Sequence, residues 1–319
     1  MKDISVIIPA HNAGRSIAST IRSLASEADL IEEILIVDDG STDGTAEIAE
    51  QTGRQSGLPV LVKRVARFQA GAARNVGIKM AVSPWLYFID ADDIHMKDGL
   101  RNLLRKGTEH GSTGIVVGSY IRRTDGVDRL IDAPAGYGLS KLENAGNYLI
   151  DKCETINVGA ALIRSLAIGT VRFPEGVAYE EDTLFWARLL TQAGVDKMPD
   201  PVLTYQISTE RADNRLLVQP ATQFFIWRKA LRELGTVRID EDTLRRREAL
   251  LAIKIARVHY LHGSFRTAER FLMIARPLPK TARTQWRFWR YRLKLWLNRS
   301  TRTPEGPGRS HKESPDLRM

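Results

Sequence analysis

Short apolar segments alternate with helical patterns from the start of this 319-residue chain to residue 89. The apolar segments cover residues 4–8, 34–37 and 85–89, and residues 60–65 are predicted as the third strand in the order of the chain. Apolar runs that are this short and do not alternate with polar residues indicate strands buried on both faces. Strands and helices that alternate with short connections predict a parallel, doubly wound sheet, so we expect an α/β fold.

Acidic residues directly follow two of these predicted strands. Asp38 and Asp39 follow the second, and Asp90, Asp92 and Asp93 follow the fourth. Ligands bind at the carboxyl ends of the strands in open α/β sheets. Three carboxylates so close in sequence repel one another unless a cation neutralises them, and such hard oxygen ligands suit Mg²⁺ or Mn²⁺. We therefore expect a metal site, with a solvated acidic turn as the alternative.

The rest of the first 219 residues predicts further helices and strands around this sheet. We expect helices at residues 43–52, 71–81, 98–108 and 182–190, and strands at 114–123, 157–164 and 202–207. Ser41, Thr42 and Asp43 are candidates for capping the first of these helices. Residues 132–157 are less regular, and their prolines and glycines predict a loop that shapes an acceptor pocket.

Charge is divided unevenly along the chain. Residues 1–219 hold 24 Lys and Arg against 29 Asp and Glu, whereas residues 220–319 hold 23 against 9. An acidic body argues against nucleic acid as a partner, while the basic C-terminal part predicts contact with an anionic surface. The single cysteine, Cys153, fits a reducing compartment. We expect no signal peptide, because the N-terminus enters a strand at once, and no apolar run near 18 residues suggests a membrane-spanning helix.

Four motifs occur together in a distinctive order. They are residues 6–12 (VIIPAHN), 36–45 (IVDDGSTDGT), 73–77 (ARNVG) and 88–93 (FIDADD). In this order and spacing they resemble the family 2 glycosyltransferases, which are inverting enzymes with the GT-A nucleotide-binding fold. The resemblance covers roughly residues 3–210. It implies a catalytic domain at 1–219, with a nucleotide-sugar half at about 1–95 and an acceptor half at about 96–219.

The resemblance implies a set of residues that bind a nucleotide-sugar donor. The opening loop and Asp39 are expected to face the base and ribose, and Asp39 can accept the imide N–H of a uracil. Arg74 is expected to contact the diphosphate, with a surface salt bridge as the alternative. For Asp38 and Asp39 the alternative is a helix-capping turn. The implied donor-binding residues are Pro9, Ala10, Asn12, Asp38, Asp39, Arg74, Asn75, Asp90 and Ala91.

The acids after residue 89 match the Asp-x-Asp motif of the family. The resemblance implies that Asp92 binds Mn²⁺ or Mg²⁺ and that Asp90 contacts the ribose or a metal-bound water. The ion would bridge the diphosphate and stabilise the leaving group. Asp93 is an extra acid that supports the site or caps a helix. His11 and His95 have no partner histidine at metal-ligand spacing, which argues against zinc.

A second acidic cluster precedes an aromatic-rich helix. Glu181 and Asp182 resemble the acidic pair on the acceptor side of the family. We expect Asp182 to be the catalytic base, because an inverting displacement needs a carboxylate to take the acceptor proton. Glu180 and Glu181 compete for that role, and a simple helix cap is the alternative. The sequence departs from the family pattern in the loop before Arg74 and in the segment after Tyr205. In the second of these segments, Arg211 or Arg215 would close over the diphosphate.

The C-terminal hundred residues predict helices. Residues 220–279 form a helical extension, residues 280–299 a basic amphipathic helix, and residues 300–319 a disordered tail. On a helical wheel the 280–299 segment has an apolar side flanked by cations, which fits an anionic membrane interface. The alternative is a helix that docks on the protein. The apolar side holds Trp286, Trp289, Leu293, Trp296 and Leu297, and the adjoining side Arg283, Arg287, Arg290 and Lys294.

These expectations combine into one functional hypothesis. The chain would transfer a sugar, most plausibly from a UDP-sugar, to a saccharide or lipid-linked saccharide in cell-envelope or exopolysaccharide assembly. It would be cytoplasmic and peripheral on the inner face of the plasma membrane. A nucleotidyltransferase is an alternative, but residues 10–15 poorly match the Gly-rich, basic loop that it needs after the first strand. The other alternative is a non-catalytic protein that binds membrane or nucleic acid.

Overall fold

The computed structural model describes residues 2–66, 69–109, 111, 113–138, 140–207, 216–276 and 282–300. The chain divides into two compact units, Met1–Glu248 and Ala249–Met319. Arg211, Arg215 and residues 301–319 of the expected disordered tail at 300–319 lie outside the described residues, whereas Ser300 is the last residue of a helix.

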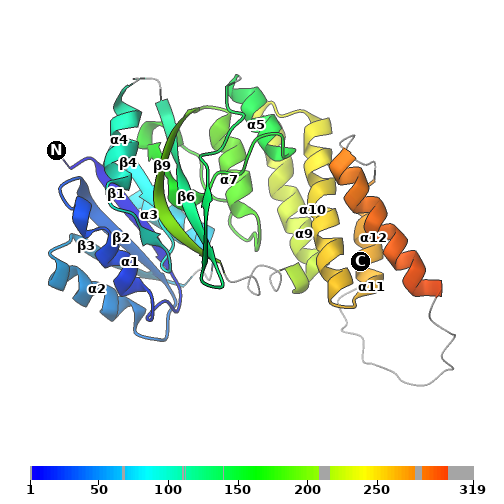
Figure 1. The fold of residues 1–319 in the computed structure, drawn as a ribbon, viewed down its shortest axis with the longest axis horizontal. Helices are drawn as coiled ribbons and strands as arrows, with labels where there is room; N and C mark the ends of the chain where they lie inside the picture. The colour runs from blue at the N-terminus through cyan, green and yellow to red at the C-terminus, as the bar shows by residue number, and fades with distance from the viewer. Residues whose placement is uncertain are drawn as a thin grey trace. The chain divides into compact units, whose positions relative to one another are not determined.

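A mixed nine-stranded sheet forms the centre of the first unit (Figure 1). Its strand order is β3-β2-β1-β4-β8-β6-β9-β5, with β7 paired to β6. The first four strands in that order are all parallel, whereas β8 pairs antiparallel with both β4 and β6. The expected α/β doubly wound fold is confirmed. The strands are β1 (Ile4–Ala10), β2 (Ile31–Asp39), β3 (Val60–Val65), β4 (Trp85–Phe88), β5 (Ile94–His95), β6 (Thr113–Thr124), β7 (Val127–Ile131), β8 (Ala161–Arg164) and β9 (Gly194–Ile207).

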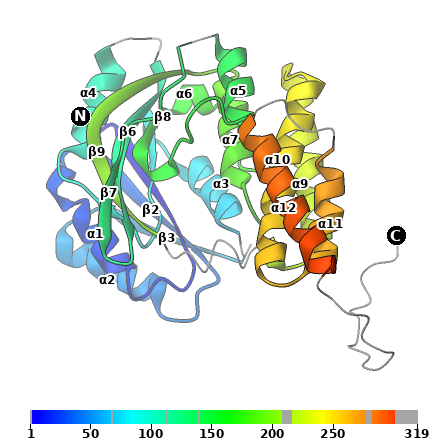
Figure 2. The same cartoon turned by 45° about the vertical axis from the view of Figure 1, so that its right-hand side comes forward.

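Helices pack against both faces of this sheet (Figure 2). Val6 and Ile8 of β1 belong to the core cluster that includes helix α1, whereas Ile7 points to the opposite face and meets helix α3. A Cβ atom at Gly77 would lie 2.3 Å from Ile7 Cγ2, so only glycine lets α3 approach β1 this closely. The α-helices of this unit are α1 (Ile17–Ser23), α2 (Thr45–Ser56), α3 (Ala70–Met80), α4 (Gly99–Glu109), α5 (Lys141–Leu149), α6 (Ser165–Ile168), α7 (Glu181–Leu190), α9 (Pro220–Arg232) and the first part of α10 (Glu241–Leu261).

Three local predictions differ from the structure. The predicted loop at 132–157 contains helix α5, which a reciprocal capping box between Ser140 and Glu143 initiates. Strand β9 begins at Gly194 rather than at residue 202, because its polar first part pairs in parallel with β6. Gly44, at a φ of 80°, occupies the N-cap of α2 and makes no side-chain cap. The predicted capping is confirmed for Asp43 alone among Ser41, Thr42 and Asp43, because Asp43 Oδ1 accepts a hydrogen bond from Thr45 N–H at 3.2 Å in the first turn of the helix.

The second unit contains the rest of α10, helix α11 (Phe265–Ile274) and helix α12 (Ala282–Ser300). Tyr260 packs edge-on against Phe265 and Tyr291. Phe288, Tyr291 and Leu295 form the buried side of α12. Among the described helices, none is both long and apolar enough to cross a membrane.

Candidate functional site

The predicted donor-binding loops meet at one edge of the sheet. Strands β1, β2 and β4 are neighbours and run in parallel, so their carboxyl ends lie together. Ala10 at the end of β1 is paired in register with Asp38 of β2. The Asp90–Asp93 segment follows β4 at the same edge. The structure therefore brings the first two acidic clusters together, as the sequence predicts for parallel strands.

Asn12 ties the loop after β1 to the loop after β2. Its Oδ1 accepts a hydrogen bond from Thr42 N–H at 2.9 Å, and its own N–H donates to Ser41 Oγ at 2.9 Å. Asn12 adopts a φ of 51°, a left-handed conformation that asparagine tolerates better than most residues. The residue thus shapes the edge at which donor binding is expected.

Asp38 and Asp39 are both buried and both organise the backbone around them. Asp38 Oδ1 accepts from Ser41 N–H at 3.2 Å, and Asp39 Oδ2 accepts from Gln69 N–H at 2.6 Å. His11 Nδ1 donates to the Asp39 carbonyl oxygen at 2.7 Å. The Asp39 carboxylate therefore joins the end of β2 to the start of α3, and the Asp39 backbone carbonyl joins β2 to the loop after β1.

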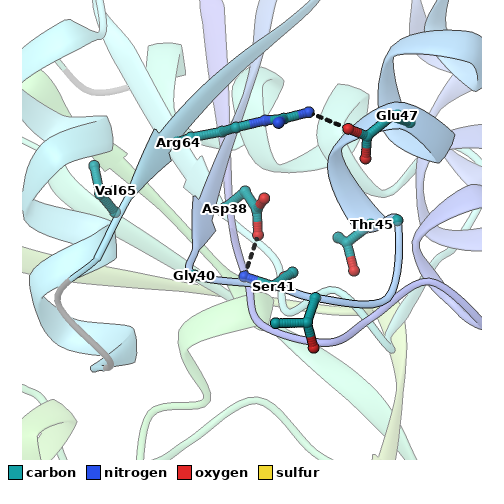
Figure 3. A pocket seen from close by; sticks show the side chains of 9 residues that line it. Asp38, Gly40, Ser41, Thr45, Glu47, Arg64 and Val65 are labelled. Carbon is teal, nitrogen blue, oxygen red and sulfur yellow. Dashed lines mark hydrogen bonds and ion pairs between the residues drawn. The ribbon is translucent and has the colours of Figure 1, made fainter.

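A cavity of about 390 Å³ opens beside Asp38 (Figure 3). The Arg64–Glu47 ion pair, 2.5 Å long, lies at its rim. Asp38 is the one lining residue that belongs to the predicted donor-binding set, so this cavity is at most one side of the expected site. Its lining is Asp38, Gly40, Ser41, Thr42, Gly44, Thr45, Glu47, Arg64 and Val65.

Arg74 connects the acids after β4 to the acids of α7. Its Nη2 donates to Asp90 Oδ1 at 2.6 Å, and its Nη1 lies 3.8 Å from Glu181 Oε1. Its side chain is only 6% exposed, and its guanidinium lies 5.3 Å from the centre of the Phe173 ring. The Asp90 side chain remains 41% exposed. A surface salt bridge, the alternative to a site role, is therefore excluded for Arg74.

Opposing effects act on the guanidinium of Arg74. Burial lowers its pKa, but the negative charges of Asp90, Glu181 and Asp182 outweigh that effect and raise the pKa above its ordinary value. Arg74 therefore stays a cation at the point where the three carboxylates converge. A fixed buried cation of this kind suits a ligand that carries its own negative charge.

Asn75 is placed differently from the expectation. Its Nδ2 donates to the Phe173 carbonyl at 2.9 Å, and its Oδ1 accepts from Phe173 N–H at 2.9 Å. Nδ2 also lies 3.4 Å from Glu175 Oε1. The side-chain amide thus holds the segment that leads towards α7. The predicted contact between Asn75 and the donor stays a prediction.

The acids after β4 create a strongly negative environment. Burial, together with the charges of Asp90 and Asp92, raises the pKa of Asp93 to about 9, although Gln206 N–H donates to its Oδ1. Burial and the same acids raise the pKa of Tyr205 to about 12, and Asp182 contributes to that shift. The charges of both acidic clusters therefore act on Tyr205 of β9. Nothing in the sequence predicted this placement, because an aromatic residue in a strand is common and does not by itself indicate a site.

The carboxylate oxygens of these acids are suitable ligands for a divalent cation that also binds phosphate. Within the described ranges, no group of three or more His, Cys, Asp or Glu side chains is arranged to hold a metal alone. Mg²⁺, however, is commonly held by one or two carboxylates together with substrate phosphates. Asp90 and Asp92 would supply such carboxylates, which lie close to a third acid, Asp93, whose pKa burial and the charges of these two acids raise.

The acceptor-side acids occupy the start of α7. Glu181 and Asp182 lie in its first turn, and Asp182 Oδ1 accepts from Thr183 N–H at 2.8 Å. Glu180, at the N-cap position, adopts a φ of 56° and makes no side-chain cap. A simple helix cap, the alternative role for these acids, is therefore not supported for Glu180. The charge of Asp182 acts on both Arg74 and Tyr205, so this acid faces the same centre as Asp90.

A family model supports the sequence resemblance. Residues 5–159 match the model described as glycosyl transferase family 2. Residues 5–159, just under half of the chain, therefore belong to glycosyl transferase family 2. The family match contains Asp38, Asp39, Arg74 and the Asp90–Asp93 segment, all of which the structure gathers at the same end of the sheet.

Relatives of this chain include a putative teichuronic acid biosynthesis glycosyltransferase. The chain is 29% identical over 189 residues to the putative teichuronic acid biosynthesis glycosyltransferase TuaG of Bacillus subtilis, covering 59% of this chain and 71% of TuaG. Alignments to two other curated glycosyltransferases span only 38% and 36% of their lengths. The chain therefore matches well under half of those two relatives.

Solved structures share the fold of this family 2 protein. Staphylococcus aureus TarS 1–349 in complex with UDP-GlcNAc aligns with a TM-score of 0.62 and 20% identity, covering 92% of this chain and 80% of TarS. The mannosyltransferase PcManGT of Pyrobaculum calidifontis, in complex with GDP-Man and Mn²⁺, aligns with a TM-score of 0.55 and 14% identity, covering 93% and 79%. These similarities establish the GT-A-like fold.

Proposed function

We propose that this protein is an inverting, metal-dependent glycosyltransferase that uses a UDP-sugar and an acceptor hydroxyl. The observation that carries the proposal is the placement of Arg74 between Asp90 and Glu181. This guanidinium joins the acids after β4 to the acids of α7, so both groups face one centre. A transfer reaction needs such a centre, with a donor side and an acceptor side.

Asp182 is the proposed base in this reaction. Its carboxylate would take the proton of the acceptor hydroxyl while that oxygen forms a bond to the anomeric carbon of the sugar. The bond from the anomeric carbon to the diphosphate breaks in the same step, and the nucleoside diphosphate leaves with the electron pair. Glu181 would orient the acceptor, and Arg74 would attract the negatively charged diphosphate.

Asp92 and Asp90 would hold Mn²⁺ or Mg²⁺ against the diphosphate. A bound divalent ion neutralises the charge that develops on the leaving group. The chain's own contribution is to fix the Asp90 carboxylate beside Arg74 and to bury Asp93 nearby in the sequence. PcManGT, which shares the fold, was solved with Mn²⁺ and a nucleotide sugar, and this supports the assignment.

The donor and acceptor classes follow from similar proteins and from charge. TarS was solved with UDP-GlcNAc, and TuaG is described by its place in teichuronic acid biosynthesis. We accordingly assign a UDP-sugar as donor, and a saccharide or lipid-linked saccharide of the cell envelope or an exopolysaccharide as acceptor.

Two measurements test this function. Hydrolysis of a panel of UDP-, GDP- and dTDP-sugars with and without Mn²⁺ should identify a UDP-sugar as the preferred donor. Calorimetric titration with UDP should show binding that depends on Mn²⁺ and is lost in Asp92→Ala. UDP binding that needs no metal, or an Asp92→Ala variant with full Mn²⁺-dependent activity, would refute the metal assignment.

Helix α12 suggests where the reaction takes place. Trp286, Trp289 and Trp296 are 59%, 54% and 61% exposed, whereas Phe288 and Tyr291 fill the opposite side. Arg290 lies 5.0 Å from the centre of a Trp286 ring. Exposed tryptophans beside cations suit the interface of an anionic membrane, and we assign this surface to the inner face of the plasma membrane.

Vesicle co-sedimentation tests the membrane assignment. The full chain should sediment with phosphatidylglycerol vesicles at low salt, and replacing Trp286, Trp289 and Trp296 together by serine should release it. Val127→Ser with Leu130→Ser is the matched control, because these residues are 70% and 57% exposed on strand β7. A full chain that stays in the supernatant at low salt would show that α12 does not bind membranes.

A further inference from the structure

Arg247 of α10 is a buried cation that contacts the segment before the α7 acids. Its Nη2 donates to Glu180 Oε2 at 2.5 Å, and its Nη1 donates to Asp151 Oδ1 at 3.2 Å. Nη1 also lies 3.4 Å from the Leu149 carbonyl oxygen at the end of α5. One guanidinium therefore joins α5, the start of α7 and α10, all within the first compact unit.

Both carboxylates that Arg247 binds belong to residues in a left-handed conformation. Asp151 and Glu180 each have a φ of 56°. Such a conformation is unfavourable for a residue other than glycine unless the surrounding structure compensates. The ion pairs to Arg247 anchor the side chains of both residues. The Glu180 side chain is only 11% exposed, so its charge also depends on this partner.

Glu180 occupies a decisive place in the chain. It is the N-cap residue of α7, and Glu181 and Asp182 follow it directly. The φ and ψ of an N-cap residue set the direction in which the first turn of a helix projects. If Glu180 returned to an extended conformation, the first turn of α7 would move, and with it Glu181 and Asp182.

We propose that Arg247 is a positioning residue that fixes the α7 acids by holding Glu180 in its left-handed conformation. The proposal rests on the proposed function, because it assigns those acids to the acceptor side of a transfer reaction. The start of α10 would therefore contribute to catalysis indirectly. Arg247 would act through Glu180 rather than on the reacting atoms.

Arg247→Met tests the proposal, because it should lower turnover without weakening the binding of the donor nucleotide. A misplacement of about 1 Å costs on the order of 100-fold in rate, so kcat should fall roughly 10- to 100-fold. The affinity for UDP with Mn²⁺ should stay within about threefold of the wild-type value, because the acids after β4 are untouched. Arg247→Lys should recover part of kcat, since lysine restores the positive charge but not the planar guanidinium group that binds two carboxylates.

Arg232→Met is the matched control. Arg232 of α9 also binds two carboxylates, but these partners, Glu241 and Glu248, belong to α10 and not to the segment before α7. Its variant should lose thermal stability to a comparable extent and keep its kcat. Equal kcat losses in the two variants would show that loosening of the helices alone explains the effect, and the proposal would fail.

Glu180→Gly provides the decisive second variant. Glycine adopts positive φ without strain, so it should not need Arg247. The double variant Arg247→Met/Glu180→Gly should therefore regain most of the kcat that Arg247→Met loses. A double variant as slow as Arg247→Met overturns the proposal.

The proposed function and the proposed role of Arg247 can be refuted separately. A wild-type protein that turns over no nucleotide sugar, while it binds UDP normally, would refute the glycosyltransferase assignment itself. A wild-type protein that turns over a donor, with an Arg247→Met variant of equal kcat, would refute only the role of Arg247.

Discussion

The side-chain amide of Asn75 forms two hydrogen bonds with the backbone of Phe173, each 2.9 Å long. Gln69 adds a third connection, because its Oε1 accepts from Gly176 N–H at 2.6 Å. The start of α3 therefore holds the 173–176 segment, which leads to Glu180 and the acids of α7. Asp39 accepts from Gln69 N–H, so the same contacts also reach the end of β2.

Asn75→Ala should reduce stability more than donor affinity. The variant leaves the Phe173 N–H and carbonyl without the amide, and a lost buried partner costs about 1–3 kcal/mol. Thermal unfolding and the donor KM should be measured together. An unchanged melting temperature with a large rise in KM would instead support the direct donor contact that the family resemblance implies.

Arg74→Met should impair both folding and donor binding. Removing one member of a buried ion pair costs about 3–5 kcal/mol, and the partial exposure of Asp90 places the expected loss at or below the lower end of that range. Arg74→Lys keeps the charge and should be less destabilised. Chemical denaturation and UDP titration check these outcomes; an Arg74→Met variant of wild-type stability would contradict the buried pairing.

Asp182→Asn and Glu181→Gln separate the two acids of α7. Loss of a general base typically lowers kcat by about 10²- to 10⁴-fold, so Asp182→Asn should show a loss of that size with UDP affinity nearly unchanged. Glu181→Gln should mainly raise the acceptor KM. If Glu181→Gln is instead the variant without turnover, the two roles are exchanged.

Glu27 should make folding sensitive to acid. Burial raises its pKa, but the hydrogen bond and charge of His95 and the backbone N–H groups of Leu100 and Arg101 outweigh burial and lower the pKa below its ordinary value. The stabilisation from this carboxylate is therefore complete above its unfolded pKa of about 4.3 and is lost as the pH falls through the lower folded value.

Glu27→Gln tests this dependence. The variant should be less stable than the wild type at pH 7, and the difference in the free energy of unfolding should shrink below about pH 4.3. Denaturant titrations at pH 7 and at pH 3 provide the two values. A difference that is equal at both pH values would show that the charge of Glu27 does not stabilise the fold.

The sequence predicted the strand ends well because their pattern depends on local composition. Residues buried on both faces of a parallel sheet must be apolar in succession, so β1, β2 and β4 are visible as short apolar runs. Acids that follow such runs must lie at the edge where ligands bind. Asp38, Asp39 and the Asp90–Asp93 segment can therefore be grouped from the amino-acid sequence alone.

The remaining features depend on contacts between distant residues. Asn75 and Phe173 are separated by nearly a hundred positions, and no local pattern distinguishes an amide that binds a backbone from one that binds a ligand. The same holds for Arg247, which lies among other charged residues of α10. The first part of β9 was missed because its pairing with β6 stabilises a polar stretch of low strand propensity.

The close contact between Gly77 and Ile7 has a consequence for the reactive centre. Arg74 and Gly77 are three positions apart, so they lie near one another along the same side of α3. A methyl group at position 77 would push this helix away from the sheet and withdraw the guanidinium from Asp90. The absence of a side chain at one position therefore sets how far a cation one turn away can reach.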